Sequence, residues 1–84
     1  MVKTHFVEDC KIHVDHKVSA IVNGIIIMGT ISSIYEDVVT IQDASLIADG
    51  EVRRFNNYNV DADKVAGWSI MEKEGSFNNL KQLR

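Results

Sequence analysis

The segment from Asn23 to Val39 reads NGIIIMGTISSIYEDVV, and it decides how the rest of the chain is interpreted. Asn23-Gly24 is a residue pair that tolerates positive φ well, so it predicts a tight hairpin turn. The β-branched residues that follow predict a strand from Ile25 to about Tyr35. Gly29 falls inside this strand, where a glycine permits the sharp bend that a small closed sheet needs.

Four further strands are predicted around this segment. Strict alternation of apolar and polar residues predicts a half-buried strand over Ile12–Val22. Glu36-Asp37 is typical of a turn, and Asp49-Gly50 is a second hairpin signal. The other predicted strands are Val38–Ala48, Glu51–Val60 and Val65–Met71, with a short turn at Asp61–Lys64. Five short strands joined by tight turns indicate an all-β fold, a small and strongly bent barrel or meander.

The two ends of the chain give weaker signals. Phe6 and Cys10 would share one face of a short N-terminal helix capped by Thr4, and an extended strand is the alternative. The stretch 72–84 is polar and asparagine-rich, so we expect a tail after a core that spans about residues 12–71. A chain of 84 residues is expected to form a single domain, 1–84.

Charge and composition argue against several classes of protein. A formal net charge of −3 argues against a globally basic nucleic-acid binder, although a local basic patch stays possible. The longest apolar run, Ile25–Met28, is far too short to cross a bilayer, so no membrane partner is expected. A single cysteine, Cys10, permits no internal disulfide, and a cytoplasmic location is the expectation.

The spacing of these residues resembles a known family. The segment VSAIVNG (18–24), then GTI (29–31) and SSIYEDVV (32–39), is similar to the first motif of the Sm/LSm/Hfq family. The bacterial Hfq version is closest, since it also has Asn-Gly before the strand and Val-Val after the acidic turn. The segment VDADKV (60–65) occupies the place of the family's second motif.

The resemblance implies a five-stranded, strongly bent Sm-like barrel. It also implies a homo-oligomeric ring of five to seven copies, in which the fourth strand of one copy pairs with the fifth strand of the next. RNA is the partner that the family suggests. Such pairing is physically reasonable, because an open barrel has two strand edges that are liabilities unless they are paired.

The sequence departs from the family where uridine would bind. The position of the stacking ring is Asp37, that of the base-reading asparagine is Val39, and that of the motif's arginine is Asp61. The family's first-motif acid falls on Tyr35, and the glutamine–aromatic pair of Hfq falls on Glu36-Asp37. Carboxylates at a pore rim would repel phosphate, so the usual uridine pocket is expected to be non-standard or lost.

A second candidate RNA surface lies in the fourth predicted strand. The stretch RRFNNYN (53–59) mixes cations, aromatics and amides, the residue types that hold phosphates and stack bases. The candidate RNA-binding residues are Arg53, Arg54, Phe55, Asn57 and Tyr58. The alternative is an ordinary strand whose aromatic residues pack in the core.

No metal site, cofactor or catalysis is expected. Cys10, His13 and His16 are three residues apart, which alternates faces in a strand, so they should not converge on a metal. We expect a buried, hydrogen-bonded His16, a solvent-facing His13, and Trp68 either in the core or at a subunit interface. No glycine-rich phosphate loop or nucleophile–base pair supports an enzyme.

Two hypotheses for the function follow. The first is an RNA-binding ring that acts as an RNA chaperone through a non-standard surface. The second is a protein-interaction or assembly ring that has kept the fold and does not bind RNA. A monomeric barrel that binds a peptide by edge pairing is a third, weaker alternative.

Overall fold

The computed structural model describes residues 2–71, and the predicted tail 72–84 lies outside them. A helix, α1 (Val2–Lys11), precedes five strands: β1 (Lys17–Val22), β2 (Ile25–Tyr35), β3 (Val38–Ala48), β4 (Glu51–Asp61) and β5 (Val65–Met71). One 3₁₀ turn, Ala62–Lys64, joins β4 to β5. No helix within residues 2–71 is long and apolar enough to cross a membrane.

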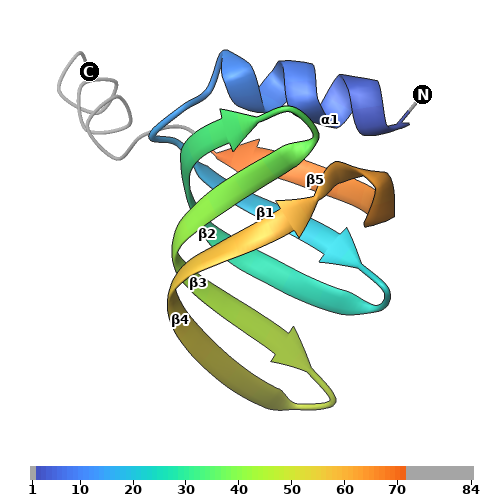
Figure 1. Ribbon diagram of the computed structural model, residues 1–84. Coiled ribbons are helices and arrows are strands. Elements are labelled where there is room, and N and C mark those ends of the chain that lie inside the picture. The colour runs from blue at the N-terminus through green and yellow to red at the C-terminus, as the bar shows by residue number, and fades with distance from the viewer. Residues whose placement is uncertain (1, 72–84) are drawn as a thin grey trace, which may run out of the picture.

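The strands form one antiparallel sheet with the order β4-β3-β2-β1-β5. The sheet curls strongly, so that its two outer strands approach each other across an open barrel (Figure 1). The described residues pair no strand with the free edges of β4 and β5. The prediction of a small, strongly bent five-stranded all-β fold is therefore confirmed. The barrel is open between β4 and β5, the two outer strands of the sheet.

Two hairpin turns form where their sequences predict them. Asn23 and Gly24 have φ values of 51° and 79°, and Asp49 and Gly50 have 53° and 77°. Positive φ at both central residues is the geometry that matches the twist of flanking strands, and Asn-Gly and Asp-Gly adopt it at low cost. These turns set the register of β1 with β2 and of β3 with β4.

Gly29 lies where two strands approach most closely. A Cβ atom at this position would lie 2.4 Å from Ile41 Cγ2 and 2.8 Å from the Gln42 carbonyl oxygen. The β2–β3 register also shifts between Met28 and Thr30, on either side of the glycine. The bend predicted at Gly29 therefore coincides with an irregular register and a close approach of β3.

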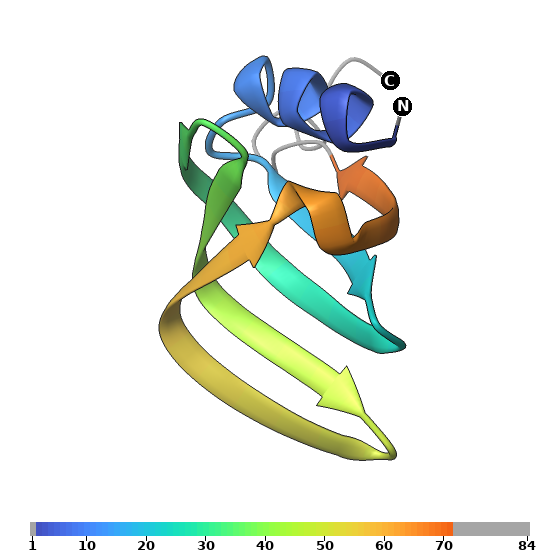
Figure 2. The same cartoon turned by 45° about the vertical axis from the view of Figure 1, so that its right-hand side comes forward.

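The core lies between the concave face of the sheet and α1. Phe6, Val7 and Cys10 project from the helix onto buried residues of the strands, among them Val18, Ile27, Ile31, Val39, Ile41 and Val60. Figure 2 shows α1 lying across one end of the barrel. The spacing of Phe6 and Cys10 predicts this buried helix face, and the helix rather than the strand extension is present.

The first predicted strand is partly wrong. Residues 12–16 form a turn, and β1 begins only at Lys17. The backbone amides of His13 and His16 donate to the carbonyls of Cys10 and His13, and Asp15 has a φ of 76°. Ile12 and Val14, which the alternation predicts to be buried, are exposed. Thr4 lies inside α1 rather than at its N-cap, because the helix begins at Val2.

Candidate nucleic-acid interface

Two turns that are far apart in the sequence meet at one end of the barrel. The backbone amide of Ala62 donates to the carbonyl oxygen of Asp37 at 2.8 Å. Asp61 caps the 3₁₀ turn, since its Oδ1 accepts a hydrogen bond from the Asp63 amide at 3.0 Å. The structure thus brings together Asp37 and Asp61, two of the positions at which the family would hold a base.

A lysine from the helix lies between these two turns. Lys3 Nζ is 3.1 Å from Asp63 Oδ1 and 3.4 Å from Asp37 Oδ2. The Asp63 and Asp37 carboxylates raise the pKa of Lys3. All three side chains are substantially exposed, so the pairs contribute little to stability. They do neutralise part of the negative charge that the sequence places at this end of the barrel.

Val39 cannot read a base at this site. Its side chain is completely buried in the core, and its strand partner is Val60. Asp37 and Asp61 bring carboxylates, in place of a stacking ring and a guanidinium, to the two turns, where Lys3 lies between Asp37 and Asp63. This geometry accords with a non-standard inner pocket.

The predicted patch on β4 is largely exposed. All residues from Glu51 to Asn57 are exposed, because the β3–β4 hairpin extends beyond the rest of the sheet (Figure 1). Phe55 is 41% exposed, whereas Tyr58 is partly buried against the core. Their rings are 5.7 Å apart between centroids and tilted by 47°. Tyr58 therefore matches the alternative of an aromatic residue packed against the core, whereas Phe55 remains available for a ligand.

A shallow hollow lies beside Phe55. It has a volume of about 220 Å³ and is lined by Asp43, Ala44, Arg54, Phe55 and Asn56. A guanidinium, an amide and an aromatic edge in one hollow can hold a phosphate and contact a base. Asp43, which also lines the hollow, is negatively charged and would restrict where a phosphate can bind.

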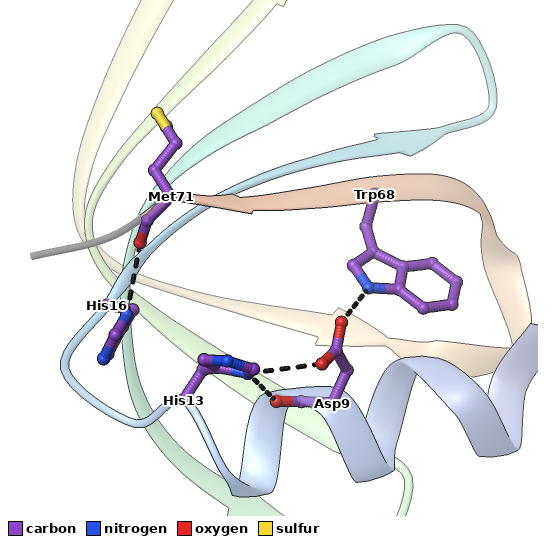
Figure 3. Close-up of polar contacts among 5 residues, drawn as sticks. All are labelled: Asp9, His13, His16, Trp68 and Met71. Atoms are coloured by element: carbon purple, nitrogen blue, oxygen red, sulfur yellow. Dashed lines mark hydrogen bonds and ion pairs between the residues drawn. The ribbon is translucent and has the colours of Figure 1, made fainter.

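The histidines belong to a polar network rather than a metal site (Figure 3). Asp9 Oδ2 accepts a hydrogen bond from Trp68 Nε1 at 2.8 Å, and Asp9 Oδ1 lies 3.2 Å from His13 Nδ1. His16 Nδ1 is 3.2 Å from the Met71 carbonyl oxygen. No group of three metal-ligating side chains occurs within residues 2–71. His16 is hydrogen-bonded as predicted, but it is only partly buried.

Cys10 is a core residue. Its side chain is fully buried, and burial, followed by the charge of Asp9, raises the pKa of its thiol to about 12. A thiol in this environment is not a nucleophile at neutral pH.

Sequence reasoning missed Lys3 and Asp9. Both lie on α1, while their partners lie on the β2–β3 turn, the 3₁₀ turn and β5. Neither contact follows a local spacing rule, so only the packing of α1 across the barrel reveals them. Trp68, predicted for the core or an interface, is half-buried and packs edge-on against Phe6 with centroids 5.3 Å apart.

Comparison with solved structures identifies the fold. The Pyrococcus abyssii Sm protein in complex with a uridine heptamer is 26% identical, with a TM-score of 0.66 over 77% of this chain and 96% of that chain. The SmAP1 heptamer of P. aerophilum is 19% identical, with a TM-score of 0.64 over 87% and 97%. A novel Sm-like archaeal protein from Pyrobaculum aerophilum is 16% identical, with a TM-score of 0.69 over 93% and 61%.

No protein-family model matches the sequence, and no curated protein matches it. The assignment therefore depends on the arrangement of the strands, which the solved structures share at low sequence identity. Five antiparallel strands in one bent sheet, preceded by a short N-terminal helix, agree with the sequence-based prediction and match these neighbours. The chain therefore has an Sm-like fold.

Proposed function

We propose that this protein forms a homo-oligomeric ring that binds single-stranded RNA and has no catalytic activity of its own. The observation that carries the proposal is that residues 2–71 leave the edges of β4 and β5 unpaired, at the two ends of one bent sheet. Pairing of β4 in one copy with β5 in the next would satisfy both edges, and a repeated head-to-tail contact closes into a ring. Solved neighbours with this fold include heptamers.

RNA is the favoured ligand because one of the similar structures, at 26% identity, is an Sm protein in complex with a uridine heptamer. The proposed contact surface lies on β4. It consists of the exposed residues Arg53, Arg54, Phe55 and Asn57 and the partly buried Tyr58. Arginines supply the charge that holds phosphates, and Phe55 offers a face on which a base can stack. The resemblance of Asn23-Gly24 and Val38-Val39 to the Hfq form of the motif stays a prediction.

An assembly ring without RNA is the second candidate, and the two turns at the end of the barrel favour it. Asp37, Asp61 and Asp63 gather there against the single bridging charge of Lys3. A ring would repeat this excess of negative charge around its rim and repel a phosphate chain. Under this candidate the partner is a protein, and oligomerisation occurs without RNA affinity.

Two measurements separate the candidates. The mass of the purified protein in solution, by light scattering or native mass spectrometry, tests the ring directly, and a monomer would contradict both candidates. Fluorescence anisotropy with U-rich, A-rich and mixed oligonucleotides, at low and physiological salt, tests RNA binding. A ring that binds at physiological salt supports the RNA proposal, whereas a ring that binds none of the oligonucleotides supports the assembly candidate.

A matched pair of variants tests the β4 surface. Arg53→Ala and Lys11→Ala each remove one exposed cation, one from β4 and one from α1. If β4 contacts the phosphates, Arg53→Ala should weaken binding and make it less dependent on salt, while Lys11→Ala should change neither. Equal effects of the two substitutions would indicate that only the overall charge matters and that β4 is not the contact.

A further inference from the structure

A row of branched aliphatic side chains crosses the sheet on the face opposite the core. Ile21 pairs with Ile26, Ile26 with Ile47, and Ile47 with Val52, so one residue from each of four adjacent strands contributes. Ile21, Ile26 and Val52 are exposed, with Val52 54% exposed, and Ile47 is partly exposed. We refer to these four residues as the outer row. Exposed apolar surface that continues across several strands is typical of a contact site.

A groove of about 470 Å³ runs beside the outer row. Its walls include Met28, Ile47 and Val52 together with two cations, Lys17 and Arg54. Met71, the last described residue, also lines it and pairs with Lys17 in the register of β1 and β5. The chain therefore leaves β5 at the edge of this groove.

The segment 72–84 follows directly on Met71, at the edge of the groove. It contains two acids, Glu72 and Glu74, and three bases, Lys73, Lys81 and Arg84. The groove likewise combines Lys17 and Arg54 with Asp43, so charge does not favour one place for this segment.

The same segment complements the groove in apolar content and in reach. It contains Phe77, Leu80 and Leu83 among polar residues. Residues 72–84 can span roughly 40 Å when extended, at about 3.3 Å a residue, whereas five strands span only about 20 Å. The segment can therefore reach every member of the outer row from Met71. Burial of such side chains contributes about 25 cal/mol for each Å² of apolar surface removed from water.

We propose that residues 72–84 dock on the outer row of their own chain, with Phe77, Leu80 and Leu83 covering the apolar residues. This inference does not depend on RNA binding or on the ring. Arg54 lies at both this groove and the β4 surface, so the docked segment would also limit which side of Arg54 is open to a ligand.

Paramagnetic broadening in the full-length protein tests this proposal without RNA. A nitroxide is attached at Asn79→Cys, beside the proposed apolar contacts and not in them, since Cys10 is fully buried and its thiol is unreactive at neutral pH. We expect the methyl signals of Ile26, Ile47 and Val52 to lose most of their intensity and to recover when the label is reduced. The core methyl signals of Ile27, Ile31 and Ile41 in the same spectrum report that the variant is folded.

A matched label and a mixed sample complete the experiment. A nitroxide at Glu36→Cys, on the exposed β2–β3 turn, should leave the outer row unaffected. Broadening from position 79 no stronger than that from position 36 would overturn the proposal. A mixture of isotope-labelled chains and separate nitroxide-bearing chains identifies the source. Broadening that is equally strong in this mixture would mean that another copy supplies the segment, which would also overturn docking within one chain.

Discussion

The indole Nε1 of Trp68 donates a hydrogen bond to Oδ2 of Asp9 at 2.8 Å, which ties the helix α1 to the edge strand β5. The same indole packs edge-on against Phe6, so one side chain supplies both an apolar and a polar contact to the helix. Asp9 also pairs with His13, at the turn where the helix ends (Figure 3). If β5 pairs with a neighbouring copy, the position of this edge depends on the contact between Trp68 and Asp9.

A double-mutant cycle measures this contact. Trp68→Phe keeps an aromatic ring against Phe6 and removes the donor, while Asp9→Ala removes the acceptor. We expect a coupling free energy of about 1 kcal/mol, since the bond is part-buried and involves a charged acceptor. Urea unfolding followed by circular dichroism gives the four free energies of unfolding. Strictly additive effects of the two substitutions would show that the hydrogen bond does not stabilise the fold.

Gly29 and Gly67 provide a matched pair of glycine substitutions. A Cβ at Gly29 would collide with Ile41 and with the backbone of Gln42, whereas a Cβ at Gly67 would meet nothing within 4 Å. Gly29→Ala should therefore destabilise the protein by about 1–3 kcal/mol or more through overpacking. Gly67→Ala should be neutral or slightly stabilising, because it only restricts the unfolded chain. Equal unfolding free energies for the two variants would contradict the close approach at Gly29.

Most of the sheet could be predicted from the sequence, because the turn residues and the alternation agree. The predicted bounds of β2, β3 and β5 are those observed, and β4 is one residue longer than predicted. The first strand was overextended, since Ile12 and Val14 continue an alternation that the backbone does not follow. The left-handed conformation of Asp15 and the backbone hydrogen bonds of the turn after Cys10 prevent a strand at residues 12–16, despite the alternation.

The candidate site was less predictable. The sequence identifies Asp37, Val39 and Asp61 as departures from the family, but it gives no sign that Lys3 bridges the neighbouring aspartates. That contact joins the first turn of the helix α1 to two turns that lie more than thirty residues later in the sequence. The outer row was likewise not expected, because its exposure depends on which face of β1 to β4 the helix covers.

Burial of Cys10 predicts a specific loss of stability in alkali. In the folded protein the pKa of the thiol is about 12, whereas the unfolded chain releases the proton near the ordinary thiol pKa of 9.0. The unfolded state then binds fewer protons than the folded state, so stability falls as the pH rises between these values. The expected loss at pH 10 is about 1 kcal/mol.

A comparison with Cys10→Ala isolates this effect. The variant is less stable at every pH because it leaves a small cavity, but it lacks the titrating thiol. The difference in free energy of unfolding between the two proteins should therefore shrink from pH 8 to pH 10. Parallel stability curves over this range would show that the thiol titrates alike in both states, in contradiction to its burial.

Substitutions of the two aromatic residues of β4 should affect different quantities, RNA affinity for Phe55 and stability for Tyr58. Phe55 is exposed, so Phe55→Ala should leave the free energy of unfolding nearly unchanged and weaken RNA binding by about 1–3 kcal/mol if a base stacks on the ring. Tyr58 packs against the core, so Tyr58→Ala should destabilise the fold, and Tyr58→Phe should retain most of the packing. Tyr35→Ala is the control, since Tyr35 is an aromatic that is 76% exposed outside the patch. Anisotropy and urea unfolding on the same preparations give both quantities. If Phe55→Ala and Tyr35→Ala bind RNA equally well, the β4 patch is not where bases stack, and the assembly candidate gains support.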